Sequence, residues 1–291
     1  MTWKRVATAL VLIPVVVGLV LFASTAVVAV ATAVVTVLAL WEYFALGEAI
    51  GHRAYRAWTV FCALFMIFCS WVETRPMVDF RPASSTLSWI LSQVPAILRW
   101  PITWFFVFVL GLAVITLWTK RPLVEALPSV GISSSALLLV AFPLAFAVLL
   151  HAERPFGPQY LFFALVITWA GDTTAYFVGR AMGKHPLAPH ISPKKTWEGS
   201  VGSMVGSLIV AWAFSYWIRI PIGHLVAMAV IGNVAGQMGD LLESAYKRSA
   251  GVKDSGGLLP GHGGVLDRID ALILCIPVIW YYLVLVNPGM R

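Results

Sequence analysis

The segment 239–270 reads GDLLESAYKRSAGVKDSGGLLPGHGGVLDRID and links two apolar runs, residues 222–239 and 269–286. Each run is close to the length of about 20 residues that a bilayer-crossing helix needs. The link holds five acidic and four basic residues around a group of glycines, although only 11% of the chain is charged. So dense a cluster in so apolar a chain indicates a polar site that lies beside a membrane.

The composition of the whole chain supports this interpretation. Of its 291 residues 60% are hydrophobic, and the mean hydropathy is +0.87. Soluble globular domains have roughly 45–50% apolar and about 25% charged residues, so composition favours one integral membrane protein. The net charge of +7 does not indicate a nucleic-acid partner, because the basic residues lie in short links between apolar runs, where they orient a protein toward anionic headgroups.

Nine apolar runs are candidates for membrane-spanning segments. Lipid-facing backbone must satisfy its own hydrogen bonds, so these runs are predicted to be helices. The sequence therefore predicts an all-α polytopic integral membrane protein with about nine transmembrane helices. Residues 1–160 would supply anchoring, packing and lipid access, and residues 161–291 a catalytic region. The nine runs are 6–22, 25–46, 57–72, 101–119, 130–150, 160–180, 199–218, 222–239 and 269–286.

The basic residues also predict an orientation. With nine spans, 14 of the 20 Lys and Arg residues fall on one side of the membrane. The positive-inside rule then places the amino terminus in the cytoplasm and the carboxyl terminus outside an inner (cytoplasmic) membrane. The charged links of the carboxyl-terminal half, and any site that they form, would face the cytoplasm.

Three charged residues that precede this link in the sequence are also candidate site residues. Asp172 lies inside an apolar run, where an ionisable group is costly and by default functional, although a structural pair with a Lys or Arg is the alternative. Lys194 and Lys195 precede a helix start rich in Gly and Ser. Amide groups at a helix start attract anions, so these lysines suit a triphosphate or pyrophosphate, unless they only follow the positive-inside rule.

Within the charged link, acidic residues recur at helical spacing. Asp240, Glu243 and Lys247 share one helix face, which would suit Mg²⁺ or an ordinary solvated helix surface. Asp267 and Asp270 lie three residues apart at the start of the last apolar run, where carboxylates also cap helices.

The glycine-rich stretch PGHGG at 260–264 allows tight turns and a close approach of backbone to a ligand. His262 within it would bind phosphate or hydrogen-bond the loop. Two acidic clusters, two basic clusters and this loop together suit metal-assisted phosphoryl or nucleotidyl transfer. The sequence contains no GxxxxGK[ST] motif, which disfavours a P-loop enzyme.

Two segments resemble a known family, the phosphatidate cytidylyltransferases, also called CDP-diacylglycerol synthases. The resemblance covers roughly the last 125 residues. Tyr246 stands where the family usually has an aliphatic residue. The matching positions are Asp172, Ala175, Tyr176, Gly179, Arg180, the run SPKKTWEG at 192–199, Ser244, Lys247, Arg248, Lys253, Asp254, Gly256, Pro260, His262, Gly263, Gly264, Asp267, Arg268 and Asp270.

The resemblance implies a reaction in phospholipid biosynthesis, in which CTP and phosphatidic acid give CDP-diacylglycerol and pyrophosphate at a magnesium site, with a second cation such as K⁺. It implies catalytic roles for Asp240, Asp267, Asp270, Lys247 and Arg248. Substrate binding is expected from Lys194, Lys195, Lys253, Ser244, His262, Gly263, Gly264 and Arg268. The expected metal ligands are Asp240 and Asp267, then Asp270 and Asp254, with Asp172 at the second cation or the cytidine end.

Other interpretations stay open at this point. The acceptor could be another lipid phosphate or a polyprenol, because apolar chains leave little specificity in a sequence. A transporter with an ion site at Asp172 is a different class, but the other ionisable residues gather at one face instead of crossing the bilayer. A purely structural scaffold would leave the charged link unexplained. The small residues Gly199, Gly202, Ser203 and Gly206 allow close helix packing, within the chain or across a homodimer.

Overall fold

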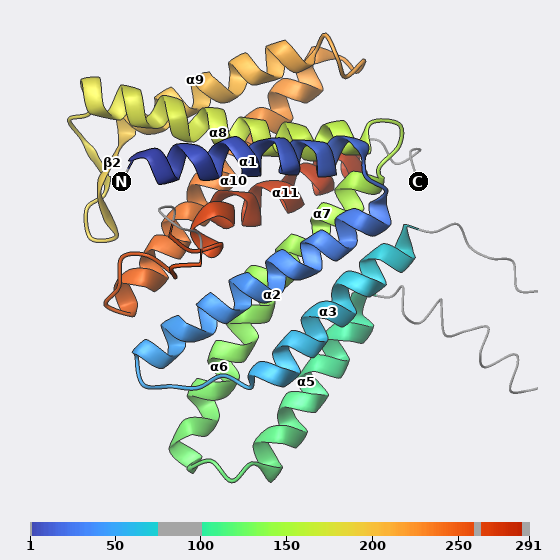
Figure 1. Cartoon of the computed structure of the whole chain (residues 1–291), viewed down its shortest axis with the longest axis vertical. Helices are drawn as coiled ribbons and strands as arrows, with labels where there is room; N and C mark the ends of the chain where they lie inside the picture. Colours follow the sequence, from blue (N-terminus) through green and yellow to red (C-terminus); the bar gives the residue numbers. More distant parts are fainter. Residues whose placement is uncertain (1, 75–100, 259–262, 287–291) are drawn as a thin grey trace, which may run out of the picture.

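The computed structural model describes residues 2–74, 101–258 and 263–286, and most of them are helical (Figure 1). The amino-terminal half contains α1 (Thr2–Phe22), α2 (Thr25–Ala49), α3 (Arg56–Glu73), α5 (Pro101–Trp118), the 3₁₀ turn η1 (Leu123–Glu125), α6 (Ala126–Ala136), the π-helical turn η2 (Leu137–Ala141) and α7 (Phe142–Ala152). The carboxyl-terminal half contains α8 (Gly157–Met182), β1 (Pro186–Ala188), β2 (Ser192–Thr196), α9 (Trp197–Phe214), α10 (Ile222–Ser249) and α11 (Leu266–Val286).

Each of the nine predicted runs falls on one of these helical segments. In the described part of the chain, six helices are long and apolar enough to cross a membrane: α2, α3, the continuous stretch Leu123–Ala152, α8, α10 and α11. Shorter apolar helices cover Leu10–Phe22 within α1 and Thr103–Trp118 within α5. The Gly- and Ser-rich α9 is 18 residues long. The protein is therefore an all-α polytopic membrane protein, as predicted.

The links between helices gather on two opposite sides of the molecule. Figure 1 shows the α2–α3, α5–α6, α8–α9 and α10–α11 links at the left and lower left, and the α1–α2, α7–α8 and α9–α10 links at the right. This alternation is the arrangement that the distribution of basic residues requires. Which side faces the cytoplasm stays a prediction.

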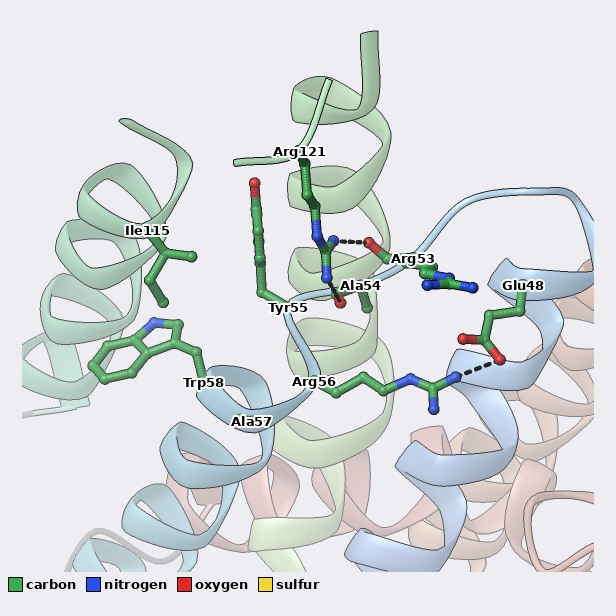
Figure 2. Close-up of a pocket in the computed structure, with 9 residues that line it drawn as sticks. All are labelled: Glu48, Arg53, Ala54, Tyr55, Arg56, Ala57, Trp58, Ile115 and Arg121. Atoms are coloured by element: carbon green, nitrogen blue, oxygen red, sulfur yellow. Dashed lines mark hydrogen bonds and ion pairs between the residues drawn. The ribbon is translucent and has the colours of Figure 1, made fainter. Parts of the chain in front are cut away.

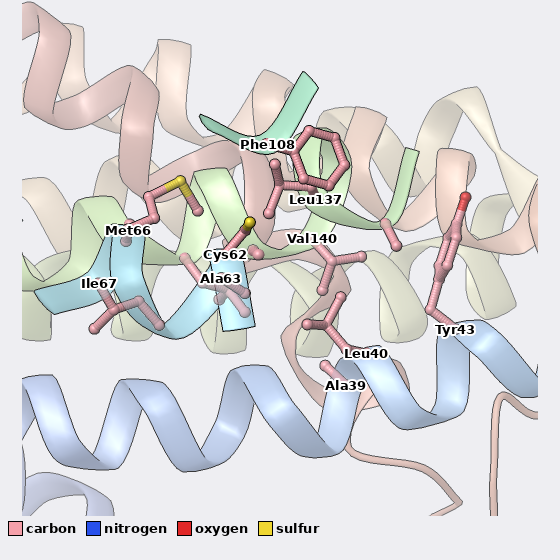
Figure 3. Packing of buried hydrophobic residues seen from close by; sticks show 14 of the residues in the cluster. Ala39, Leu40, Tyr43, Cys62, Ala63, Met66, Ile67, Phe108, Leu137 and Val140 are labelled. Carbon is pink, nitrogen blue, oxygen red and sulfur yellow. The ribbon is translucent and has the colours of Figure 1, made fainter. Parts of the chain in front are cut away.

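Two hydrophobic clusters hold the helices together. One lies between α2, α3, α5 and the stretch from α6 to α7, where Leu40, Met66 and Leu137 are fully buried (Figure 3). The other lies between the five helices from α7 through α11 and includes part of α1, with Tyr160 and Met228 fully buried in it. Interhelical packing of this kind holds membrane helices together by van der Waals contact.

Glycines let α8 and α9 approach each other closely. A Cβ atom at Gly202 would lie 2.7 Å from the Val178 side chain, and one at Gly199 would lie 3.0 Å from the Ala175 carbonyl oxygen. Gly206 in the same way faces Thr174. The predicted small-residue face of α9 therefore packs within the chain.

Two details go beyond the nine apolar runs. The link after α8 contains an antiparallel hairpin, β1–β2, which pairs Pro186 with Thr196. The segment is too short for a periodic pattern to reveal it. In addition, α10 continues beyond the apolar run 222–239 as one helix to Ser249, so Asp240, Glu243 and Lys247 lie on one helix, as their spacing predicted; the residues that follow the run are mostly good helix formers, and Lys247 and Arg248 favour the last turn.

Candidate active site

A pocket of about 630 Å³ lies between α8, β2, α9 and α10. Its wall brings together residues that are far apart in the sequence: Asp172 on α8, Lys194 and Lys195 on β2, and Asp240 on α10. The remaining lining residues are Ala175, Tyr176, Gly179, Arg180, Leu187, Thr196, Gly199, Ser200, Ser203 and Gln237. The first of the two segments that carry the family resemblance thus lines this cavity, together with Gln237 and Asp240 of α10.

The basic side of the pocket is set by the start of α9. Thr196 caps this helix, because its hydroxyl oxygen accepts a hydrogen bond from the Gly199 amide at 3.1 Å. The cap fixes the preceding strand, so Lys194 and Lys195 line the pocket. Lys195 forms an ion pair with Asp240 across the cavity. On α8, Arg180 donates a 2.8 Å hydrogen bond to the Tyr176 hydroxyl.

The hairpin itself is tied to α9 by Glu198. Its carboxylate accepts hydrogen bonds from the Lys184 amide at 3.1 Å and the His185 amide at 3.3 Å, and it pairs with His185 Nδ1 at 2.6 Å. Hydrogen bonds from its own backbone amide first, and then from His185 and Lys184, lower the pKa of Glu198 to about 2. The carboxylate is therefore ionised at neutral pH, and it holds the hairpin against the helix start.

A chain of polar side chains joins α9 to α10, and Ser200, Ser203 and Gln237 of this chain line the pocket. The Ser200 hydroxyl donates to Gln237 Oε1 at 2.5 Å, and the Gln237 amide donates to Asn233 Oδ1 at 2.6 Å. Asn233 in turn donates to the hydroxyl oxygens of Ser203 and Ser207, both at 2.8 Å. Sequence reasoning did not identify this network, although polar residues at i, i+4 within an apolar run were a visible signal.

Two carboxylates, Asp172 and Asp240, line the acidic side of the pocket, and a third, Asp270, lies outside its lining but interacts with both. Asp172 interacts electrostatically with Asp240, Lys195 and Arg268. Asp270, near the start of α11, interacts in turn with Asp240 and Asp172. These oxygens suit a hard cation. Within the described ranges, however, no three His, Cys, Asp or Glu side chains stand close enough together to form a ready-made metal site.

Lys247 occupies the centre of a second polar cluster beside the pocket. Its side chain, which is 11% exposed, forms ion pairs with Glu243 one helical turn earlier and with Asp267 at the start of α11. The bond from Lys247 Nζ to Asp267 Oδ1 measures 2.6 Å. Because it is shared by two carboxylates, this buried lysine joins α10 to α11 by a charge-assisted contact.

The other oxygen of Asp267 organises the loop before α11. Asp267 Oδ2 accepts hydrogen bonds from the Ser255 amide at 3.1 Å and the Gly264 amide at 2.9 Å. Gly263 has a φ of 82°, in the left-handed region that glycine tolerates, and a Cβ atom there would lie 2.9 Å from Asp267 Oδ2. Both oxygens of Asp267 are therefore engaged within the protein.

Glu42 is a site residue that sequence reasoning missed. It belongs to α2 and is 3% exposed, yet its carboxylate accepts three hydrogen bonds from the charged link. The donors are the Ser255 hydroxyl at 3.0 Å, the Val265 amide at 3.0 Å and the Leu266 amide at 2.8 Å. Glu42 thereby caps α11 from another helix. An acidic residue inside an apolar run was the signal, the same one that pointed to Asp172.

The remaining predicted residues lie around this second cluster. Arg248 is exposed and donates to the carbonyl oxygens of Ile191 at 3.3 Å and Val252 at 3.1 Å, which ties α10 to the hairpin. Ser244 is buried on α10, whereas Lys253, Asp254 and Arg268 are exposed. His262 lies outside the described residues.

The tight fit around Glu42 gives a first prediction. A Cβ atom at Gly264 would lie 2.3 Å from both Glu42 Oε2 and Ser255 Oγ. Gly264→Ala is therefore expected to lower stability by about 1–3 kcal/mol, the usual cost of overpacking, and to lower the apparent melting temperature. Gly257→Ala is the matched control, because a Cβ atom there meets nothing within 4 Å. Equal melting temperatures for the two variants would contradict the described contact.

Comparison with known sequences assigns the chain to a family. The profile of the cytidylyltransferase family matches residues 3–286. A phosphatidate cytidylyltransferase of Bacillus subtilis is 39% identical over 178 residues, which cover 60% of this chain and 66% of the relative. That of Staphylococcus haemolyticus is 45% identical over 131 residues, 44% of this chain and 50% of the relative. The matches thus span half to two thirds of these relatives. The chain belongs to the cytidylyltransferase family.

Proposed function

We propose that this protein is a phosphatidate cytidylyltransferase, which transfers CMP from CTP to phosphatidic acid. A phosphate oxygen of the lipid attacks the α-phosphorus of CTP. The bond between that phosphorus and the oxygen it shares with the β-phosphorus breaks, and pyrophosphate leaves with that oxygen. The product is CDP-diacylglycerol. The observation that carries the proposal is the pocket in which Lys194, Lys195, Asp172 and Asp240 converge, in a chain of this family.

The basic wall of the pocket suits the triphosphate of CTP. Arg180, Lys194 and Lys195 line the same cavity and present three positive charges. Such groups stabilise the negative charge that accumulates on departing pyrophosphate. Lys195 is already paired with Asp240, so binding of the nucleotide would exchange one anionic partner for another. The apolar surroundings strengthen this interaction.

We propose that Mg²⁺ binds at the acidic wall, where substrate phosphates would complete its set of oxygen ligands. The carboxylates of Asp172, Asp240 and Asp270 interact with one another, and the amide oxygen of Gln237 lies in the same lining. Mutual repulsion of three carboxylates favours a bound cation, and Mg²⁺ prefers such oxygens together with substrate phosphates. We assign Asp240, Asp270 and Asp172 as residues that would hold it. When bound, the metal would neutralise phosphate charge and align the reacting oxygens.

The second cluster has a supporting role in this proposal. Asp267, in the first turn of α11, holds Lys247 and the loop before that helix, and Asp270 follows three residues later on the same helix. The loop would thereby keep Asp270 and Arg268 near Asp172, with which both interact electrostatically. Lys247, Arg248 and Lys253 add positive charge on the side from which a lipid phosphate would approach.

The acceptor can be identified directly. The purified full chain is incubated with labelled CTP, Mg²⁺ and one acceptor at a time: phosphatidic acid, a polyprenyl phosphate or diacylglycerol. Mass spectrometry of the lipid products is expected to detect CDP-diacylglycerol with phosphatidic acid and no CMP- or phosphate-bearing product with the other two. A nucleotidylated polyprenyl phosphate, or phosphatidic acid formed from diacylglycerol, would contradict the proposed acceptor.

Lys195→Gln tests the triphosphate contact. The substitution removes a charge-assisted contact, and such contacts contribute ~1.5–3 kcal/mol, so we expect KM for CTP to rise about tenfold or more. Lys120→Gln is the matched control, since Lys120 is exposed in the α5–α6 link and lines no described pocket. If KM for CTP were the same in both variants, Lys195 would not bind the nucleotide.

A further inference from the structure

A second pocket, of about 370 Å³, lies in the amino-terminal half, away from the proposed active site. It is formed where the α2–α3 link meets the start of α3 and the end of α5 (Figure 2). Its charged lining consists of Arg53, Arg56, Arg121 and Glu48, and its apolar lining includes Trp58 and Ile115. It shares no lining residue with the pocket around Asp240.

The three arginines are not equally engaged. Arg121 donates to the carbonyl oxygens of Arg53 at 2.5 Å and Ala54 at 3.2 Å, and its guanidinium lies 4.7 Å from the centre of the Tyr55 ring. Arg56 pairs with Glu48 at 2.6 Å. The Arg53 side chain is exposed and makes no hydrogen bond or ion pair with any residue that the structure describes. The pocket therefore carries a net positive charge and one guanidinium that is available to an anion.

An aromatic track leads away from these charges along α3. Figure 2 shows Trp58 and Ile115 facing each other on the side of the pocket opposite Glu48. The Trp58 ring stacks on Phe61 with centroids 5.4 Å apart, and Phe61 stacks on Phe65 at 6.3 Å. Phe61 is 54% exposed on a helix that is apolar enough to cross a membrane. A cationic end followed by an exposed apolar track matches the two ends of a phospholipid.

We propose that this pocket binds the phosphate of an anionic membrane phospholipid. Arg53 and Arg56 contact the phosphate, and one acyl chain lies along Trp58, Phe61 and Phe65. A free phosphate ion would satisfy the arginines but would leave the aromatic track exposed, so the geometry favours a phosphate carried by a lipid. The site is distinct from the CTP pocket, and its occupancy does not depend on the proposed reaction.

Lipid retention tests the proposal. The full chain, purified in detergent and stripped of lipid, is titrated with phosphatidylglycerol, which the proposed reaction does not use, or with phosphatidylcholine, and bound lipid is counted by native mass spectrometry. Wild type should retain phosphatidylglycerol more strongly than phosphatidylcholine. Each basic residue near a membrane surface contributes about fivefold to binding, so Arg53→Gln should lower retention about fivefold, and Arg53→Gln with Arg56→Gln still further.

Arg219→Gln is the control, because Arg219 is exposed in the α9–α10 link on the opposite side of the molecule (Figure 1). It should retain phosphatidylglycerol as wild type does. Equal retention of the two lipids by wild type, or unchanged retention in Arg53→Gln, would overturn the proposal. Displacement of phosphatidylglycerol by an equal concentration of inorganic phosphate would overturn the assignment to a lipid. Because the Arg53 side chain has no hydrogen-bond or ion-pair partner among the residues that the structure describes, its substitution is expected to leave the protein folded, which the apparent melting temperature checks.

Discussion

Replacing Asp267 with asparagine is expected to reduce CTP-dependent turnover about 100-fold or more. The change removes one negative charge from the carboxylate that holds Lys247 at 2.6 Å and the Ser255 and Gly264 amides at 3.1 and 2.9 Å. Loss of one group that sets an electrostatic site typically reduces turnover by 10²–10³-fold. Asparagine is nearly isosteric, and Glu243 continues to pair with Lys247, so the chain should still fold.

The control for Asp267→Asn is Glu125→Gln, which removes a carboxylate that pairs with His52 at 3.3 Å, away from the active site. Exposed or partly exposed pairs of this kind contribute at most ~1 kcal/mol. Turnover and melting temperature should therefore stay close to those of wild type. Full turnover in Asp267→Asn would remove Asp267 and its contacts from the catalytic account.

Glu42→Gln is expected to loosen the loop before α11 and to lower turnover, although Glu42 belongs to α2. The carboxylate accepts three hydrogen bonds, and glutamine would turn an amide donor toward some of those donors. Hydrogen bonds to a charged group contribute ~1.5–3 kcal/mol, so we expect a loss of stability of about this size. Hydrogen exchange, followed by mass spectrometry, should rise at Val265 and Leu266.

This local readout distinguishes a positioning role of Glu42 from a general loss of stability. Exchange in the hydrophobic cluster around Leu40 and Met66 should change much less than exchange at the start of α11. Glu125→Gln again serves as the control and should leave exchange at Val265 and Leu266 unchanged. If Glu42→Gln exchanged at the same rate as wild type in this segment, the described cap on α11 would be wrong.

Much of the fold could be predicted from sequence because the membrane leaves few alternatives. Apolar runs of about 20 residues must form helices there, and each of the nine runs does so. The hairpin β1–β2 was missed because its strands have three and five residues. Hydropathy placed the end of the apolar run at residue 239, whereas α10 continues to Ser249, because a helix need not end where its apolar run ends.

The candidate site was predicted unevenly, for a related reason. Lys194, Lys195, Asp172 and Asp240 could be identified individually, and the structure brings them into one pocket. The residues that they and the neighbouring charged residues contact belong to distant segments, and a single sequence does not show which distant segments meet. Glu42 and Ser255, for example, are 213 positions apart in the chain. The spacing of Asp267 in the sequence also does not tell whether its carboxylate binds a metal ion or pairs with Lys247.

The most direct test of the proposed reaction is release of pyrophosphate from CTP by the purified full chain, measured with and without phosphatidic acid and Mg²⁺. We predict that pyrophosphate forms only when phosphatidic acid and Mg²⁺ are both present, and that its amount equals that of CDP-diacylglycerol. Turnover should be lost after chelation by EDTA and should recover when Mg²⁺ is restored. Asp240→Asn should abolish the signal. Pyrophosphate release that is independent of phosphatidic acid, or unchanged turnover in Asp240→Asn, would contradict the account.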